Sequence, residues 1–175
     1  VYDAVGNVTS MRDRAAETIH FNNQVVTPDA DYTYDALNRL IEATGREHMG
    51  AGRAGTSLQD DHHGNGRFGL AHPHDGQAMR RYRRLFDYDK AGNIDTVHHY
   101  ATGGTWSRHY AYHGESNRLR ATSLPGDATP DNPSSLPDRY VHDADGNITT
   151  MLHLSDLVWD HRGRLVEGNY SPPSA

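Results

Sequence analysis

One short motif recurs six times along this chain, and it constrains the fold more than any other feature of the sequence. Each copy begins with an aromatic residue or a histidine, which an aspartate follows in five of the copies. The copies end alternately in Gly-Asn-aliphatic and in Arg-Leu, so the larger repeat is a pair of units. Such self-similarity indicates stacked copies of one supersecondary unit. The copies span Tyr2–Val8, Tyr34–Leu40, Tyr88–Ile94, His113–Leu119, His142–Ile148 and Trp159–Leu165.

The fourth copy fits the motif least well. In YHGESNRL (112–119) the unit either loses its acid or carries one extra residue after Tyr112. The two units of a pair start 32, 25 and 17 residues apart, which suits loops of variable length on a fixed frame. The positions expected to build the repeat are Tyr2, Asp3, Gly6, Asn7, Tyr34, Asp35, Asn38, Arg39, Leu40, Tyr88, Asp89, Gly92, Asn93, Asn117, Arg118, Leu119, Asp143, Gly146, Asn147, Trp159, Asp160, Gly163, Arg164 and Leu165.

The residue types of the unit predict a β-hairpin turn. Its aspartate can accept hydrogen bonds from backbone N–H groups two or three residues on. Gly or Asn then takes the positive-φ position that other residues resist, as in hairpin loops of three to five residues. Flanking segments such as WSRHYAY (106–112) alternate, and no long run has helical periodicity. The fold class is therefore predicted to be all-β, with antiparallel β-hairpin repeats forming a curved ribbon of about a dozen strands.

The strands that leave the turns do not alternate cleanly. Ile94 and Val97, for example, are both apolar but are spaced by three, which places them on opposite faces of a regular strand. Either a β-bulge after the turn or a strand covered on both sides would explain this spacing.

The composition agrees with a β-rich chain. Only 35% of the 175 residues are hydrophobic, while Tyr (10), Gly (17) and His (13) are abundant, which predicts a core that is partly aromatic and partly polar. The formal net charge of -6 argues against a nucleic-acid partner. The chain has no cysteine, and no apolar run approaches the roughly 20 residues of a membrane span. It starts within the motif and without Met, so we expect a piece of a longer chain, with any targeting signal elsewhere.

The repeated units resemble a known family. Tyr-Asp-x-x-Gly-Asn and Tyr-Asp-x-x-x-Arg-Leu in series are similar to the RHS, or YD, repeat. More specifically, the ordered segments resemble the RHS region of insecticidal Tc toxin complexes, in their C component and in related large RHS proteins. The resemblance runs from about residue 2 to about residue 168. The segments that carry it are YDAVGNV (2–8), YTYDALNRLIEATGREH (32–48), FDYDKAGNI (86–94), SNRL (116–119) and GNITTMLHL…LVWD (146–160).

The resemblance implies an architecture and a function. In that family, YD repeats form a β-sheet ribbon that spirals into a hollow shell around a toxic segment from the C-terminus of the same chain. The implied partners are the rest of the chain's own RHS shell, a B-type shell component and the C-terminal toxin cargo, in a secreted complex without direct membrane insertion. The family's self-cleavage motif, Asp-Pro-x-Gly followed by Asp-Gly-x-Asn-x-Tyr, is absent here, so we expect no catalytic residue and no cofactor in this segment.

Residues 46–80 interrupt the repeats with a Gly-rich and His-rich insertion. Its histidines His62, His63, His72 and His74 are weak candidates for metal ligands, because His is a common ligand of zinc and other transition metals. The runs DDHH and HPH lack a known ligand spacing, and a Gly-rich segment does not preform a metal cage. We therefore expect a surface insertion between two strands and no metal site.

Two further segments complete the domain organisation expected for 1–175, a single RHS/YD-repeat segment. Residues 124–139 carry four of the eight prolines and are expected to form a Pro-rich loop, because proline cannot pair within a central strand. Residues 169–175 are expected to form a tail.

Other patterns indicate little chemistry. DADGN (143–147) starts like an EF-hand loop, but Ile148 and Leu154 stand where that loop needs Gly and Glu. Ser107 and the other serines lie outside any Gly-x-Ser-x-Gly elbow. The cluster RRYRR (80–84) is expected to be a solvated start of a strand, with binding of an acidic partner as the alternative. The histidines on predicted strands are expected to be polar fillers of a wet sheet surface; they are His98, His99, His109 and His113.

Two alternative functions remain open at this point. One is an adhesion module that binds glycans or a partner through exposed Tyr, Trp and His side chains. The other is a metal-dependent enzyme that uses the histidines and aspartates of residues 46–80.

Overall fold

The computed structural model describes residues 1–50, 75–123, 136, 139–151 and 154–170. Within these ranges every regular element is a strand, so the predicted all-β fold class is confirmed. The part of the chain that the structure describes has no helix that could cross a membrane. The strands are β1 (Ser10–Met11), β2 (Ile19–Phe21), β3 (Gln24–Val26), β4 (Ala30–Tyr34), β5 (Leu40–His48), β6 (Met79–Tyr88), β7 (Ile94–Ala101), β8 (Trp106–Tyr112), β9 (Leu119–Thr122), β10 (Val141–His142), β11 (Ile148–Thr150), β12 (Leu154–Trp159) and β13 (Leu165–Tyr170).

The strands pair mainly with their neighbours in sequence. The largest sheet has the order β1-β4-β5-β6-β7-β8-β9, and β2–β3, β10–β11 and β12–β13 form two-stranded sheets. The chain divides into two compact units, residues 1–108 with 124–128 and residues 109–123 with 129–175. It passes from the first unit to the second within β8.

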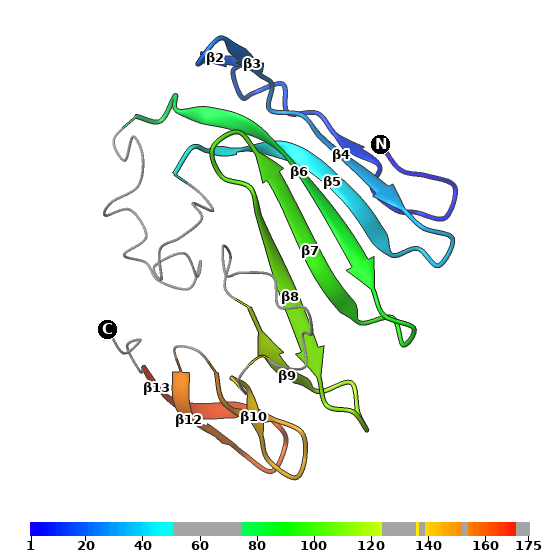
Figure 1. Ribbon diagram of the computed structural model, residues 1–175, viewed down its shortest axis with the longest axis vertical. Coiled ribbons are helices and arrows are strands. Elements are labelled where there is room, and N and C mark those ends of the chain that lie inside the picture. Colours follow the sequence, from blue (N-terminus) through cyan, green and yellow to red (C-terminus); the bar gives the residue numbers. More distant parts are fainter. Residues whose placement is uncertain (51–74, 124–135, 137–138, 152–153, 171–175) are drawn as a thin grey trace. The chain divides into compact units, whose positions relative to one another are not determined.

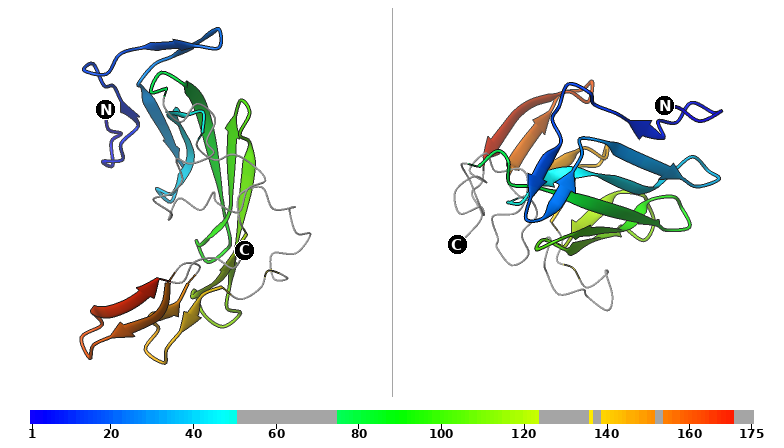
Figure 2. Two further views of the ribbon diagram at one scale, coloured as in Figure 1. Left: turned by 90° about the vertical axis from the view of Figure 1, so that its left-hand side faces the viewer. Right: turned by 90° about the horizontal axis from the view of Figure 1, so that it is seen from above.

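In the first unit, β4, β5, β6 and β7 lie side by side as antiparallel strands (Figure 1). The β4–β5 and β6–β7 turns lie at one end of these strands, and the β2–β3 hairpin lies at the other (Figure 1). In the second unit, β12 and β13 form a hairpin that the sixth motif closes (Figure 2).

A β-bulge follows the turn of every motif that joins two strands. In the third copy Tyr88 pairs with Ile94, but the next residue back, Asp87, pairs with Thr96, so Asp95 is the extra residue. The same one-residue shift occurs beside the second, fourth, fifth and sixth turns, with Ile41, Arg120, Thr149 and Val166 as the extra residues. The bulge therefore explains the spacing of three that breaks the alternation after each turn.

The buried core is small and partly polar, as the composition predicts, but the expected aromatic part is missing, because no Tyr, Trp or Phe is among the fully buried described residues. In the first unit it includes Val26 and Val97 but also Arg80 and His99, which are 1% and 0% exposed. In the second unit, Ala111, Ala121 and Leu136 pack together. The polar members are therefore structural, since they occupy positions that apolar side chains fill in an ordinary domain.

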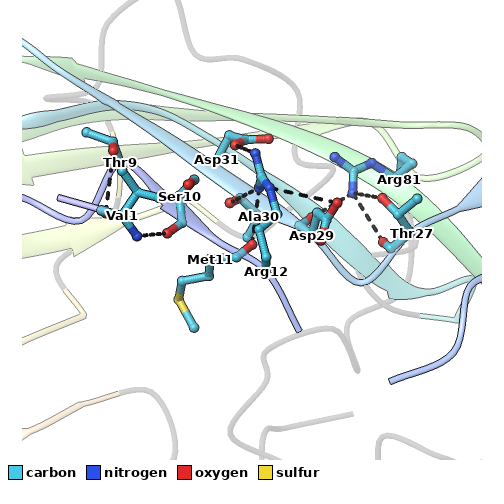
Figure 3. A network of polar contacts seen from close by, with 10 residues as sticks. All are labelled: Val1, Thr9, Ser10, Met11, Arg12, Thr27, Asp29, Ala30, Asp31 and Arg81. Atoms are coloured by element: carbon cyan, nitrogen blue, oxygen red, sulfur yellow. Dashed lines mark hydrogen bonds and ion pairs between the residues drawn. The ribbon is translucent and has the colours of Figure 1, made fainter. Parts of the chain in front are cut away.

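Within the first unit, arginine side chains bind the N-terminal residues to the longer strands (Figure 3). Arg12 donates to the carbonyl oxygen of Ala30 at 3.0 Å and forms an ion pair with Asp31. Arg81 of β6 donates to the carbonyl oxygen of Asp29 at 2.7 Å and to that of Thr27 at 3.2 Å. These contacts bind β1 and the chain that follows the β2–β3 hairpin to the longer strands.

The described strands extend further than the sequence predicts. The ends of the 46–80 insertion belong to β5 and β6, because Arg46 pairs with Arg81 and His48 pairs with Met79. Asn169 and Tyr170, expected in the tail, are the last residues of β13. Most of the insertion and of the 124–139 loop, and residues 171–175, lie outside the described residues.

Candidate functional site

The repeated motif folds into one closed turn in five of its copies. In the third copy, the amide of Asp89 donates to the carbonyl oxygen of Asn93 at 2.9 Å, and the amide of Gly92 donates back to the carbonyl oxygen of Asp89 at 3.1 Å. The same two bonds close the turns at Asp3–Asn7, Asp35–Arg39, Asp143–Asn147 and Asp160–Arg164.

The aspartate carboxylate fills the inside of this turn. Asp89 Oδ1 accepts from the amides of Ala91 and Asn93, both at 2.8 Å, and its Oδ2 accepts from the side-chain amide of Asn93 at 2.9 Å. In the second copy, Arg39 Nε replaces the asparagine and donates to Asp35 Oδ2 at 2.7 Å. The two alternating endings of the motif are therefore two donors for the same carboxylate oxygen.

The residue three positions after the aspartate of each turn has a positive φ angle. Gly6, Gly92, Gly146 and Gly163 have φ between 67° and 99°, and Asn38 takes the same position at 61°. Glycine has no Cβ to clash in this conformation, and asparagine tolerates it better than other side chains.

The fourth copy departs from this geometry. Tyr112 pairs with Leu119 as Tyr88 pairs with Ile94, so Tyr112 is the aromatic residue of this copy and the loop holds one extra residue. No aspartate lies inside the loop; the amide of His113 donates to the carbonyl oxygen of Arg118 at 3.0 Å. Ser116 Oγ accepts from the amide of Arg118 at 3.4 Å, a weak substitute for the carboxylate.

The turns hold their carboxylates ionised. The hydrogen bond from the Asn93 side chain, with those from backbone amides, lowers the pKa of Asp89, and Asn147 does the same for Asp143. Arg164 lowers the pKa of Asp160 in the same way, and for Asp35 the backbone amide of Arg39 is the main cause. A carboxylate with a lowered pKa adds stability that is fully present above its unfolded value of about 3.9 and is lost as the pH falls through the lower folded value.

Substitution Asp89→Asn should therefore lower stability at pH 6, because it removes the charged acceptor of three hydrogen bonds. The difference from the wild type should shrink as the pH falls below about 3.9, because the wild-type carboxyl is then protonated as well. Urea unfolding at pH 6 and at acid pH measures both effects. Asp145→Asn is the matched control, since Asp145 is an exposed residue of the same kind of turn; a pH-independent loss for Asp89→Asn would contradict the prediction.

A second set of hydrogen bonds joins consecutive units. The first-position aromatic residue donates to the carbonyl oxygen of the seventh residue of the preceding unit. The pairs are Tyr34 Oη to Val8 at 3.1 Å, Tyr88 Oη to Leu40 at 2.7 Å and Trp159 Nε1 to Ile148 at 2.7 Å. We call these bonds the unit joints. They fix the spacing of the turns independently of the loops between them.

Side chains of adjacent turns strengthen the unit joints. Asn7 donates from its side-chain amide to Asn38 Oδ1 at 3.0 Å, and the Arg39 guanidinium lies 4.6 Å from the ring centre of Tyr88. In the fifth copy a histidine, His142, holds the aromatic position, and its Nδ1 is buried with no hydrogen-bond partner in the described structure. Burial, together with the nearby cations Arg118 and His113, lowers the pKa of His142.

A buried ionic cluster lies on one face of β5, β6 and β7. Glu47 Oε1 on β5 accepts from Arg80 Nε at 2.8 Å and from His99 Nε2 at 3.0 Å. Arg84 Nε donates to His99 Nδ1 at 3.1 Å, so His99 carries its proton on Nε2. The His99 ring also stacks on Trp106, with ring centroids 4.8 Å apart. A side chain at Gly104 would overlap with the Arg80 guanidinium, so this glycine makes room for the cluster.

The arginines of RRYRR (80–84) all have partners within the chain. Arg80 and Arg84 belong to the buried ionic cluster, Arg81 binds carbonyl oxygens, and Arg83 forms an exposed ion pair with Glu42 at 2.8 Å. The expected solvated start of a strand is therefore wrong for Arg80, which is buried. These contacts also argue against the alternative of an acidic partner bound at this cluster.

Known proteins resemble almost the whole of this chain. No family model matches it. It is 32% identical over 166 residues to "Toxin subunit YenC2" of Yersinia entomophaga, an alignment that covers 94% of this chain and 16% of the relative. It is 30% identical over 168 residues to "Toxin subunit YenC1" of the same organism, covering 95% of this chain and 16% of the relative.

The chain is homologous to a segment of these toxin subunits. It spans about a sixth of the length of YenC2 and YenC1. The homology confirms the coarse part of the sequence-based resemblance, a relationship to toxin-complex subunits of the YenC kind.

The metal-ligand candidates His62, His63, His72 and His74 lie outside the described residues. Among the residues that the structure does describe, no group of three or more His, Cys, Asp or Glu side chains could hold a metal ion.

The strand histidines are more varied than the expected surface fillers. His99 is 0% exposed and His109 is 8% exposed, so both are core residues. His98 lies on the opposite face of β7 from His99 and contacts both Asp87 and Ser107. No local motif marked this contact, because the three residues come from three different strands.

Proposed function

We propose that this chain is a wall segment of an RHS-type shell in a secreted toxin complex, where it helps to enclose and deliver a C-terminal toxic polypeptide. The observation that supports this best is the unit joint. Each of the three unit joints links an aromatic side chain to the backbone of the preceding unit, as expected of a wall that is built from copies of one turn in series. Homology to toxin subunits agrees with this structural function.

The way in which the repeats use their polar groups supports a structural function. The carboxylate oxygens of the aspartate in each regular turn accept hydrogen bonds from residues of the same turn. The carboxylate of Glu47 accepts hydrogen bonds from Arg80 and His99. Groups satisfied in this way stabilise a wall and have little capacity left for a ligand. The proposed partners are other RHS segments of the same chain, a B-type shell component and the toxin cargo.

The adhesion alternative requires exposed aromatic side chains gathered in one place. Tyr34, Tyr88 and Trp159 are instead half-buried and donate their polar hydrogens to unit joints. Exposed aromatic residues such as Tyr2 and Tyr100 lie on different elements. The described residues therefore favour the wall over a glycan-binding face.

Protease protection of the cargo tests the proposal. In the full-length polypeptide that contains this segment, Glu47→Ala should open the wall and make the C-terminal polypeptide sensitive to protease, because it destabilises the sheet. Glu42→Ala is the matched control on the same strand, since its ion pair with Arg83 is exposed. Equal protection in the wild type and in Glu47→Ala, with the Glu47→Ala segment shown to be unfolded, would exclude a function in the wall.

A further inference from the structure

Three side chains on adjacent strands of the first unit form a continuous hydrogen-bonded chain. His98 Nδ1 on β7 lies 2.8 Å from Ser107 Oγ on β8, and His98 Nε2 lies 3.1 Å from Asp87 Oδ2 on β6. The three residues lie outside the repeated turns and outside the buried ionic cluster. A hydroxyl, an imidazole and a carboxylate in this order are the components of a nucleophile activated by a general base.

The partners determine where the proton of His98 lies. An ionised carboxylate only accepts hydrogen bonds, so Asp87 keeps the imidazole proton on Nε2. The lone pair of Nδ1 then faces the hydroxyl of Ser107 and accepts its proton. We propose that Ser107 is a nucleophilic serine, that His98 is its general base, and that Asp87 is the positioning residue that sets the tautomer of His98. The substrate class is an activated acyl or phosphonyl compound.

The sheet holds this group in place while leaving it open to solvent. His98 pairs with Leu85 and Asp87 pairs with Thr96, so Asp87 is the diagonal neighbour of His98 on one face of β6 and β7. The side chains of His98 and Asp87 are 31% and 62% exposed, so a substrate can reach them. Tyr100 stacks on His98, with ring centroids 6.3 Å apart, and adds an aromatic surface beside the histidine.

Arg83 and Asp87 are charged side chains on the same face of the sheet as His98. On the same face, Arg83 is bound to Glu42. Asp87 is the acid that contacts the imidazole, and Tyr100 is the ring that packs on it. The imidazole of His98 is therefore accessible to solvent and oriented toward Ser107.

The reaction with a fluorophosphonate illustrates the chemistry. Ser107 Oγ attacks phosphorus, a bond forms between Oγ and phosphorus, and the bond between phosphorus and fluorine breaks. The hydroxyl proton moves to His98 Nδ1 and is then released to water, and fluoride leaves. With an activated ester, the acyl group forms the ester of Ser107 and the alcohol leaves. Water then attacks that ester and gives a proton to His98, the bond between Oγ and the acyl carbon breaks, the carboxylic acid leaves, and the proton on His98 returns to Oγ and restores the serine.

Labelling with a fluorophosphonate probe tests the proposal on the 175-residue chain. Mass spectrometry should find one adduct, on Ser107, and Ser107→Ala should remove it. His98→Gln should slow the labelling about 100-fold, the lower end of the usual effect of a general base. The wild-type rate should rise with pH across the range where imidazoles titrate, and His98→Gln should lose that dependence.

Two controls keep the result interpretable. Ser116→Ala removes an exposed turn serine and should leave labelling unchanged. Asp87→Asn should slow labelling and change its pH profile, and Asp87→Glu should restore part of the rate, which a purely structural change would not do. Circular dichroism verifies that each variant is folded. A folded wild type that is not labelled, or that is labelled equally at Ser116 and Ser107, overturns the proposal whether or not the chain forms a shell.

Discussion

Replacing Glu47 by alanine should lower the free energy of unfolding by about 3–5 kcal/mol, the usual cost of removing one partner from a buried ion pair. Arg80 is 1% exposed and His99 is 0% exposed, and both donate to the same oxygen of Glu47. Without the carboxylate, the guanidinium of Arg80 remains buried without its counterion. Urea denaturation followed by circular dichroism measures the change.

The matched control is Glu42→Ala, five residues before Glu47 on β5. Glu42 binds Arg83, but both side chains are partly exposed, at 32% and 52%. Exposed ion pairs contribute little to stability, so this variant should unfold close to the wild type. The double substitution Glu47→Leu with Arg80→Met should recover much of the loss, because it removes both charges together. Similar losses for Glu42→Ala and Glu47→Ala would contradict the argument from burial.

Gly92→Val should lower the free energy of unfolding by about 2 kcal/mol, the typical cost of backbone strain at one residue. Gly92 has φ +91°, a conformation that a β-branched residue resists. Nothing lies within 4 Å of the position that a Cβ would take, so the loss would come from the backbone and not from a clash. Thermal or urea unfolding of the purified chain measures it.

Two variants separate backbone strain from the volume of the new side chain. Gly114→Val also meets open space, but Gly114 does not have a positive φ, so this variant should be nearly neutral. Gly92→Asn should cost less than Gly92→Val, because Asn38 occupies the same position of the second turn at φ 61°. A loss for Gly114→Val as large as that for Gly92→Val would contradict the assignment to φ.

The turns could be predicted from sequence because their contacts are local. Asp89 bonds only to residues up to four positions away, so the residue types alone contain the information needed. The spacing of three between apolar residues after the turns also indicated the β-bulge, although a strand covered on both sides would have explained it too. The structure shows why the motif can end in either of two ways, since the side chains of Asn93 and Arg39 donate to equivalent carboxylate oxygens.

The buried ionic cluster could not be predicted in the same way. Glu47 lies 33 residues before Arg80 and 52 before His99, and only the register of β5, β6 and β7 brings them together. Glu47 and Arg80 also lie inside the segment expected to be an insertion. The chain from Asp87 through His98 to Ser107 depends on strand register too, so an ordinary serine and histidine carried no local signal.

The unit joints give the motif turns and the connections between hairpins different freedom to change during evolution. Motif turns that a unit joint connects have fixed spacing, because each joint needs its aromatic residue opposite one particular carbonyl oxygen. The connections between successive hairpins differ widely in length, over 49–78, 102–105, 123–140 and 151–153. Insertions and deletions can therefore accumulate between hairpins while the turns that the unit joints connect keep their register. A chain built in this way can acquire new surface segments without redesign of the sheet that supports them.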